Sequence, residues 1–404
     1  MELFKLAWKN IFRQPTRSII TITSILLGIL LTMVGGSMTD GSHISMIQSI
    51  LDLSTGEMQI QHKDYHGNPS FDNFIFVDYH KIINNVKDKY PALKVAPRVT
   101  FDGLISNRDS IGAQIIAINP ESEKSVSKIV KNIISGEFLS GKGNEILVGK
   151  KMLQLLNIKL GDEVVVLSQA YMGNMAVDLF TVKGVFDLHQ DEANAYLVYT
   201  NLSAAQKFLM IDGISSIVVK ADIERVTYYT KELKKMLPSG LVVLPWDTLL
   251  PDLKQIISLD SAFGILFFII LMIILAVGVM ETIILNIHER IREIGVLLAV
   301  GMKRTQIIML FLYEGIIMVI VGGLLGTILG YLIILHYYNH PIYLESAKEL
   351  YEYFGADPYM YFALRSPLMW QMPLLLIVFF LVFLVIPIYQ VVKLKPISAL
   401  RFNK

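Results

Sequence analysis

The chain has 404 residues, and its 36 basic and 35 acidic side chains leave a formal net charge of +1. A balance this even argues against a nucleic-acid-binding surface, which needs an excess of Lys and Arg on one domain. The absence of cysteine excludes disulfides, zinc–thiolate sites, a cysteine nucleophile and lipidation of this chain at a cysteine.

A short basic segment comes first and precedes an apolar run. Residues 1–17 hold four basic side chains against one acid, Glu2. The bases are Lys5, Lys9, Arg13 and Arg17, and the aromatic residues among them are Phe4, Trp8 and Phe12. Aromatic rings interleaved with bases are typical of a helix that lies in the membrane interface. We therefore predict a cytoplasmic interfacial helix over residues 1–17.

Four uncharged apolar runs occupy residues 18–38, 261–280, 315–335 and 368–392. At a rise of about 1.5 Å per residue, about 20 helical residues cross a hydrocarbon core of about 30 Å. Together with a mean hydropathy of +0.51, the runs predict four transmembrane helices rather than buried helices of a soluble protein. The expected spans are 18–38, 261–285, 306–337 and 368–392. A signal peptide is the alternative for the first run, but no A-x-A-like cleavage site follows it.

The charges that flank these runs predict their orientation. Residues 286–305 and the tail at 393–404 are rich in Arg and Lys, whereas residues 338–367 hold more acids than bases. Short basic connections stay on the cytoplasmic side of a membrane. We therefore expect both termini and residues 286–305 in the cytoplasm, with residues 39–260 and 338–367 outside.

Residues 39–260 are numerous enough to bury a core of their own. Runs rich in β-branched residues predict strands at GEMQIQ, AQIIAI, NEILVG, DEVVVLS, LFTVKGVF, NAYLVYT, SSIVVK and GLVVLP. Helical spacing predicts helices over 78–90, 124–134, 150–158, 202–211 and 224–237. The expected fold is an α+β domain of two lobes. Residues 40–52 and 247–260 are expected to continue the first and second spans as stalk helices, which would carry helix movement outward.

The connection between the second and third spans has an amphipathic pattern. Its apolar residues are spaced four, three and four apart, which on a helix makes one stripe: Ile287, Ile291, Ile294 and Leu298. The other side carries charges that pair at i, i+3: Glu289 with Arg292, and Arg290 with Glu293. Such a helix either lies flat on lipid or docks into a partner. The spacing alone favours neither.

These features, in this order, resemble the MacB/FtsX/LolC class of ABC transporter permease. The resemblance rests on HERIREIGVLLAVGMKRTQI, on the glycines of the following span and on KPISALR near the end. SGEFLSGKGNEILVGKKMLQLLNIKLGDEVVV resembles the extracytoplasmic core domain of that class. LAWKNIFRQPTRS and DLSTGEMQIQHKDYHGNPS are closest to the lipoprotein-releasing LolC/LolE-like branch. Two features depart from the pattern: Glu281 stands where Asn is common, and residues 168–179 are shorter than the hooking loop of lipoprotein releasers.

The resemblance implies a MacB-type core domain and a coupling helix at residues 286–305 that docks into a separate cytoplasmic ATPase. The implied coupling residues are Glu289, Arg290, Arg292, Glu293, Ile294, Gly295 and Gly301. Gly295 would allow close approach, and Gly301 would end the helix. ATP and Mg²⁺ would be bound by that ATPase, and a second permease copy or a paralogue would complete a dimer.

Several motifs in the chain favour structural roles. Residues 136–143 imitate a phosphate-binding loop, but Gly143 stands where a hydroxyl must hold magnesium, so we expect no cofactor in this chain and no enzyme activity. The pairs His62/His66 and His336/His340 lack a third ligand nearby, which argues against metal. Gly322, Gly326 and Gly330 predict tight helix packing, within the chain rather than with a second copy. Glu281 and Glu314 are expected to snorkel or to pair with the loop arginines rather than to relay protons.

The leading hypothesis is therefore a permease subunit in a bacterial inner membrane that extracts or releases lipoprotein or lipid-like cargo. Candidate cargo contacts in the outer halves of the spans are Leu30, Met33, Val34, Phe263, Leu266 and Phe267; those on the outer domain are Tyr171 and Met175. The rivals are MacB-like export of a peptide, toxin or drug through periplasmic or outer-membrane partners, and FtsX-like regulation of a cell-envelope hydrolase. A membrane-bound enzyme is disfavoured because no convincing nucleophile, metal cluster or carboxylate pair is found.

Overall fold

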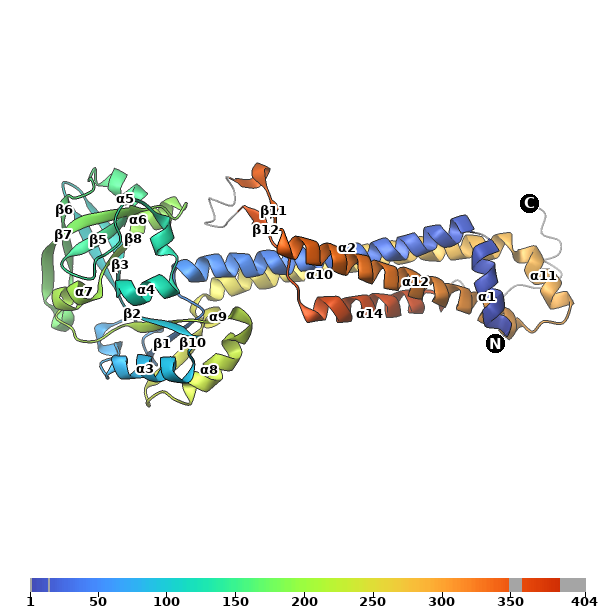
Figure 1. Ribbon diagram of the computed structural model, residues 1–404, viewed down its shortest axis with the longest axis horizontal. Coiled ribbons are helices and arrows are strands. Elements are labelled where there is room, and N and C mark those ends of the chain that lie inside the picture. The colour runs from blue at the N-terminus through green and yellow to red at the C-terminus, as the bar shows by residue number, and fades with distance from the viewer. Residues whose placement is uncertain (1, 14, 349–357, 386–404) are drawn as a thin grey trace. The chain divides into compact units, whose positions relative to one another are not determined.

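The computed structural model describes residues 2–13, 15–348 and 358–385. The chain forms two compact units (Figure 1). We call the first the helical unit; it comprises residues 1–44, 257–343 and 359–404. We call the second the outer domain; it comprises residues 45–256 and 344–358.

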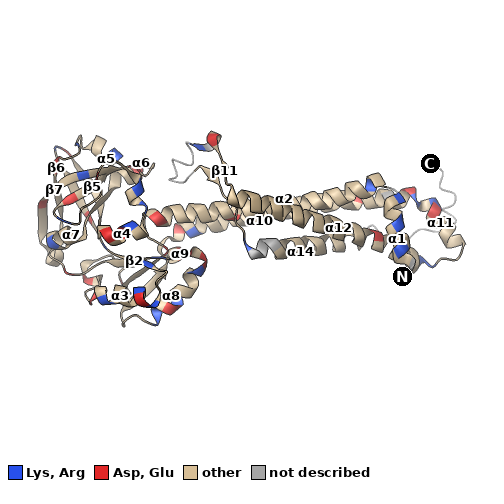
Figure 2. Ribbon diagram, viewed as in Figure 1, with Lys and Arg blue, Asp and Glu red and all other residues tan. Residues whose placement is uncertain are grey.

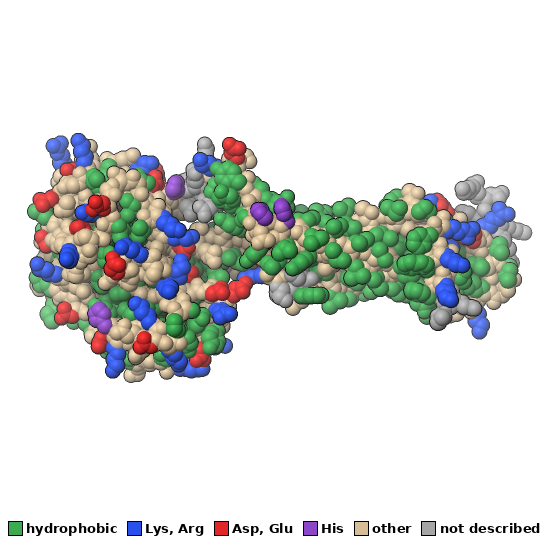
Figure 3. Space-filling model, in the orientation of Figure 1, with side chains coloured by type: hydrophobic (Ala, Val, Ile, Leu, Met, Phe, Trp, Pro, Cys, Tyr) green, Lys and Arg blue, Asp and Glu red, His purple; other side chains and the backbone are tan. Residues whose placement is uncertain are grey.

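The helical unit is built around three long helices. Its elements are α1 (Glu2–Arg13), α2 (Pro15–Leu53), α10 (Pro251–Glu289), α11 (Ile291–Ala299), α12 (Arg304–Asn339), the short strands β11 (Ile342–Tyr343) and β12 (Tyr359–Met360), and α14 (Ser366–Phe383). Hydrophobic side chains cover the face of these helices that Figure 3 shows. Their shared core contains Ile25, Ile29, Ala276, Val319 and Phe380.

Three helices in the described part of the chain are long and apolar enough to cross a membrane, namely α2, α10 and α12. The sequence predicted four. The apolar part of α14, Trp370–Phe383, is shorter than a full span. Residues 386–392 of the fourth predicted span lie outside the described residues. The structure therefore supports apolar spans and does not establish the expected number.

The outer domain contains one ten-stranded sheet in which six strands close into a ring. Its strands are β1 (Met58–His62), β2 (Lys94–Ser106), β3 (Ser110–Ile118), β4 (Ile133–Gly136), β5 (Glu145–Gly149), β6 (Glu163–Gln169), β7 (Met175–Phe186), β8 (Leu197–Asn201), β9 (Ser216–Lys220) and β10 (Leu241–Pro245). The ring runs β2-β3-β8-β5-β7-β6 and returns to β2. The strands β10-β1-β9 extend the sheet from β2. The two expected lobes therefore share one strand and one hydrophobic core.

Strand β2 changes partners at one residue. It pairs with β9 over residues 94–98 and with β3 over residues 98–106, so Arg98 is where the two ladders overlap. Pro97 lies before the β3 ladder begins and pairs with Ile217 alone, which explains how a proline is tolerated inside a sheet. Arg98 is thereby fixed at the junction of the ring and its extension.

Helices cover the sheet and enclose the core. They are α3 (Tyr79–Lys89), α4 (Pro120–Val126), α5 (Lys150–Leu155), α6 (Asp191–Tyr196), α7 (Leu202–Leu209), α8 (Val226–Lys234) and α9 (Trp246–Leu249). The Asp78 side chain caps α3 by accepting the Lys81 N–H, and Asn119 caps α4 in the same way. Val226, Tyr229 and Leu233 bury one face of α8, which lies within the predicted helix at 224–237. The predicted helix over 124–134 is wrong, because α4 ends at Val126 and strand β4 begins at Ile133.

The predicted stalks differ from each other. Helix α2 runs without interruption from Pro15 to Leu53 and so includes residues 40–52. The predicted stalk at 247–260 is broken at Leu250, where α9 ends before α10 begins at Pro251.

Candidate functional site

The charged connection that stands out in the sequence folds as a short separate helix, α11, at a charged end of the helical unit (Figure 2). Helix α10 ends at Glu289 and α11 begins at Ile291, so Ile287 lies on a different helix from the other residues of the predicted apolar stripe. Gly301 has a φ of +99°. Its N–H bonds to Leu298 O at 3.2 Å, and the Met302 N–H bonds to Leu297 O at 3.0 Å. This is a Schellman end, in which glycine supplies the left-handed residue.

One side of α11 is packed and the other is exposed. Ile291, Ile294 and Gly295 are buried. The exposed side carries Arg292 together with the apolar residues Val296, Leu297 and Val300; Val300 is 82% exposed. We call these four residues the α11 tip. The sequence analysis identified the buried apolar stripe but did not predict the exposed apolar residues of this tip, which belong to the run VLLAV at 296–300.

Arg290, predicted to contact a partner, instead points into the helical unit. Its side chain is 14% exposed and lies 3.2 Å from Glu314, whose side chain is 12% exposed. The guanidinium also lies over the Phe311 ring, 5.4 Å from its centroid. Asn10 of α1 donates to Glu314 Oε1 at 2.6 Å. Arg290 and Glu314 therefore join α1, α12 and the start of α11.

The two acids of the connection pair with the N-terminal segment. Arg17 bonds to Glu289, and Arg13 lies 3.5 Å from Glu293. Of the two predicted i, i+3 pairs, Arg290 with Glu293 forms at 3.2 Å. Glu289 does not follow the prediction, because its carboxylate contacts Arg17 instead of Arg292. Helices α1 and α2 thus hold the loop in place and leave its tip exposed.

The glycines of α12 face α2 within the chain. A Cβ at Gly322 would lie 2.8 Å from Ile22 O, and one at Gly326 would lie 2.8 Å from Leu26 O. A Cβ at Gly330 would lie 3.2 Å from Met33 Sδ. Side chains at Gly322 and Gly326 would push the two helices apart, because backbone carbonyl groups cannot rotate away. The neighbour of Gly330 is the flexible Met33 side chain, which can move.

The proposed apolar wall for cargo divides into buried and exposed parts. Met33 is 0% exposed, because α12 covers it; this contradicts its assignment as a cargo contact. Leu30 and Val34 are partly buried. Phe263, Leu266 and Phe267 on α10 are exposed, Phe267 by 61%. Glu281, on the same helix, is also exposed.

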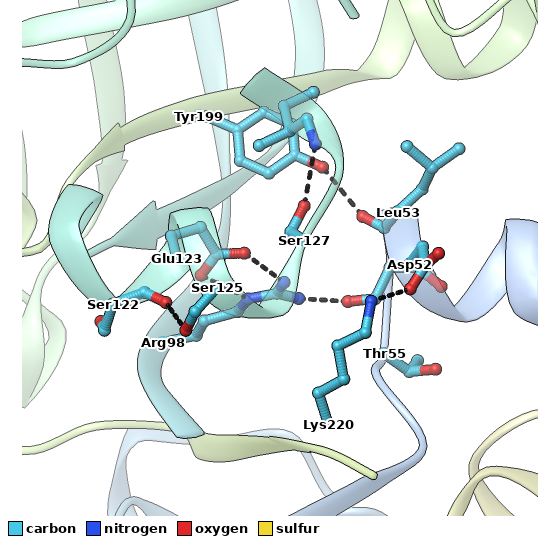
Figure 4. A network of polar contacts seen from close by, with 12 residues as sticks. Asp52, Leu53, Thr55, Arg98, Ser122, Glu123, Ser125, Ser127, Tyr199 and Lys220 are labelled. Carbon is cyan, nitrogen blue, oxygen red and sulfur yellow. Dashed lines mark hydrogen bonds and ion pairs between the residues drawn. The ribbon is translucent and has the colours of Figure 1, made fainter. Parts of the chain in front are cut away.

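A second polar cluster lies at the end of α2, inside the outer domain (Figure 4). The last carbonyl groups of a helix have no partner within it and need outside donors. Asp52 O accepts the Lys128 N–H at 2.9 Å, Leu53 O accepts the Tyr199 hydroxyl at 3.2 Å, and Ser54 O accepts a bond from Arg98 Nη1. The donors come from separate parts of the outer domain.

Arg98 is held by a carboxylate as well as by α2. Glu123 accepts Nε at 3.3 Å and Nη2 at 2.5 Å, and the two side chains are 4% and 0% exposed. Burial alone would lower the pKa of the Arg98 guanidinium, but the Glu123 charge raises it, so Arg98 stays protonated. Its positive charge also suits the negative end of the helix dipole. We call these side chains, Arg98, Glu123 and Tyr199, the α2 clamp; sequence reasoning missed it because its members are far apart in the chain.

Of the two remaining predicted contacts, Tyr171 lies in the turn between β6 and β7, and Met175 is the first residue of β7. Tyr171 is partly buried against the core and Met175 is exposed. Among the residues that the structure describes, no group of three or more His, Asp and Glu side chains gathers as a metal site.

Comparison with known proteins matches both units. Residues 18–234 match the MacB-like periplasmic core domain family, and residues 265–396 match the FtsX-like permease C-terminal family. The lipoprotein-releasing system transmembrane protein LolC of Xylella fastidiosa (strain 9a5c) is 24% identical over 76% of this chain and 77% of its own length. The macrolide export ATP-binding/permease protein MacB of Hahella chejuensis is 22% identical over 82% of this chain and 52% of its own length.

The chain therefore spans about half the length of the MacB relatives that it matches. Among solved structures, the periplasmic region of MacB from Actinobacillus actinomycetemcomitans covers 52% of this chain and 97% of its own length. It shares 16% sequence identity with a TM-score of 0.37.

Proposed function

We propose that this chain, which belongs to the FtsX-like and MacB-like family of ABC transporter permeases, transmits movement driven by a separate cytoplasmic ATPase to its outer domain. The observation that carries the proposal is helix α2, which continues for 39 residues and ends in the α2 clamp. A helix is stiff along its axis, so a displacement at one end reaches the other when that end is anchored. Arg98 and Tyr199 supply the anchor.

The α11 tip is the surface to which we assign ATPase docking. It combines one exposed base with exposed apolar residues, and interfaces gain affinity from such residues when they are desolvated. The charges around it are already paired with α1, α2 and α12, so they hold the helix rather than contact the ATPase. We propose that ATP and Mg²⁺ are bound by that separate subunit. A second permease copy or a paralogue completes the assembly in a bacterial inner membrane, with both termini cytoplasmic.

The docking assignment is tested by co-purification of the full chain with its ATPase. Changing Arg292→Glu together with Val300→Asp should abolish association and coupled ATP hydrolysis, because it places two acids on the α11 tip. The matched control, Arg108→Glu with Val77→Asp, alters an exposed base and an exposed valine of the outer domain. Unchanged association of the tip variant would contradict the assignment, whereas loss in both variants would indicate general misfolding.

For the cargo we propose a lipoprotein or lipid-like molecule taken from the outer leaflet. The LolC relative is named for lipoprotein release, and it matches along most of both chains. Exposed aromatic side chains on α10, including Phe263 and Phe267, offer an apolar surface for acyl chains. Export of another molecule is the second candidate, because the MacB relatives are named for macrolide export. An FtsX-like regulator of a cell-envelope hydrolase is the third.

Site-specific photo-crosslinking in cells separates these candidates. A crosslinker at Phe267 should capture acylated lipoprotein when ATP is depleted and less when it is restored. Met33 provides the control, because α12 covers it and a crosslinker there should capture only the chain itself. If a crosslinker at Phe267 captured only phospholipid and one at Tyr171 trapped a soluble ligand or protein, lipoprotein release would be rejected in favour of export or regulation.

A further inference from the structure

The outer domain contains a cavity of about 650 Å³ that none of the clamp residues lines. It is formed by three segments and by Gln114 of β3: the connection after β1 at residues 65–74, residues 100–102 of β2, and residues 168–173, which run from the end of β6 into the turn before β7. Because all three belong to the outer domain, the cavity does not depend on the helical unit. Cavities of roughly 300–1,000 Å³ are the size that binds drug-sized molecules.

Five of the sixteen residues that line the cavity are aromatic. They are Tyr65, Phe71, Phe74, Phe101 and Tyr171. Phe74 meets Tyr65 and Phe71 edge to face, with ring centroids 5.7 Å and 5.3 Å apart. Phe74 is buried in the core, and Tyr171 packs against that core. The rings are therefore held in place before any ligand arrives.

The charged groups around the cavity have a single sign. Asp72 and Asp102 line it, and none of the residues that the structure places around it is Lys or Arg. The Tyr196 hydroxyl donates to Asp102 Oδ1 at 3.3 Å. Burial raises the pKa of Tyr65 and of Tyr196, and the Asp102 charge raises both further. The field of this carboxylate thus reaches two phenol groups.

We propose that this cavity binds a small organic cation with an apolar body, such as a hydrophobic amine or quaternary ammonium compound. A cation is attracted to the faces of aromatic rings, and the attraction is stronger where water is excluded. Two carboxylates and no base around the rings favour a cation and repel an anion of the same shape. Thr100, Gln114 and Ser168 offer neutral polar groups for orientation. Use of this cavity as a cargo site rests on the proposed function, but the binding itself does not.

The test uses two probes of nearly identical shape and opposite charge, tetraphenylphosphonium and tetraphenylborate. Each is titrated by calorimetry into the full chain in an uncharged detergent, and the heat of titration into detergent alone is subtracted. The phosphonium should fill one saturable site per chain. The borate should show only detergent partitioning.

Three variants localise the site. Asp72→Asn with Asp102→Asn should weaken phosphonium binding about tenfold or more, because two charges are lost without a change of shape. Tyr171→Leu should weaken it by about three- to fivefold through loss of one ring face. The matched control, Asp88→Asn with Asp109→Asn, removes two exposed acids that do not line the cavity and should leave affinity within about twofold.

Equal affinity in all variants, tight binding of the borate, or no saturable site would overturn the proposal. ATPase association of the Asp72/Asp102 variant is measured in parallel. If it is retained, the proposed function stands even when the cavity proposal fails. A melting temperature equal to that of the unaltered chain shows that the variant is folded.

Discussion

Each unit of the protein contains an arginine–glutamate pair that is largely shielded from water, and the surroundings of the two pairs differ. Arg98 and Glu123 in the outer domain are almost fully buried, and the guanidinium also bonds to Ser54 O at the end of α2. Arg290 and Glu314 in the helical unit keep partial exposure, with Asn10 and Phe311 as neighbours. The first pair closes the end of a helix, whereas the second supports a loop whose tip stays exposed. The same two side chains can therefore close the end of a helix or support an exposed loop.

The largest expected effect breaks the buried pair. Arg98→Met leaves Glu123 without a partner and Ser54 O without a donor, which should lower the free energy of unfolding of the outer domain by about 3–5 kcal/mol. Arg98→Met with Glu123→Leu removes both charges and should recover much of that loss. Thermal unfolding of residues 39–260, produced as a soluble fragment, provides the measurement. If the double variant were no more stable than the single, the unpaired charge of Glu123 would not be the cause of the loss.

A smaller loss is expected from the partly exposed pair. Arg290→Met removes one partner of Glu314, but Asn10 still donates to that carboxylate, so the loss should be about 1–3 kcal/mol. Arg290→Lys keeps the charge without the planar fork and serves as the matched control. Thermal unfolding of the full chain in detergent measures both. If the free energy of unfolding fell as much as for Arg98→Met, the partial exposure of Glu314 would not reduce the cost of leaving its charge unpaired.

The smallest effect concerns Tyr199, whose buried hydroxyl bonds to Leu53 O. Tyr199→Phe should cost about 1 kcal/mol at neutral pH. Burial raises the pKa of Tyr199 to about 12, above its ordinary value of 10. The folded chain therefore holds the Tyr199 proton more tightly than the unfolded chain does. The resulting contribution to the free energy of unfolding is complete below pH 10 and is lost between about pH 10 and 12, where the unfolded chain ionises first.

At pH 11 the unaltered domain should have lost about 1.4 kcal/mol through this residue, one pKa unit's worth. The Phe variant lacks that loss, so the two proteins should become about equally stable there. Denaturant unfolding of both at pH 8 and pH 11 tests the crossover. A stability difference that stays constant with pH would mean that Tyr199 is accessible to solvent.

Local patterns predicted most of the helices and strands, and they failed where long-range packing decides. Strand β2 was missed because Pro97 and Gly103 look like breaks, yet Pro97 has a strand on one side only and is accommodated. Helical spacing placed Arg290 on the exposed face, because spacing does not show what packs against a helix. The expected pairing of Glu314 with a loop arginine is confirmed, and this contact holds Arg290 inside the helical unit. The α2 clamp was not predicted because its members are distant in sequence; Ser54 and Arg98, for example, are 44 residues apart. Spacing reports one helix face at a time and carries no information about which distant side chain will cover it.

The pairing of β1 with β10 has a consequence for how this family can diversify. These two strands, the first and last of the outer domain, are direct neighbours, with Met58 opposite Pro245. The chain therefore enters and leaves the sheet of the outer domain on two adjacent strands. Inserted domains with adjacent ends are readily exchanged or replaced without disturbing the chain that carries them. Recombination at these two points can therefore give the same set of apolar helices a new outer domain in a single step, and a replacement domain must again bind the end of α2 at Ser54.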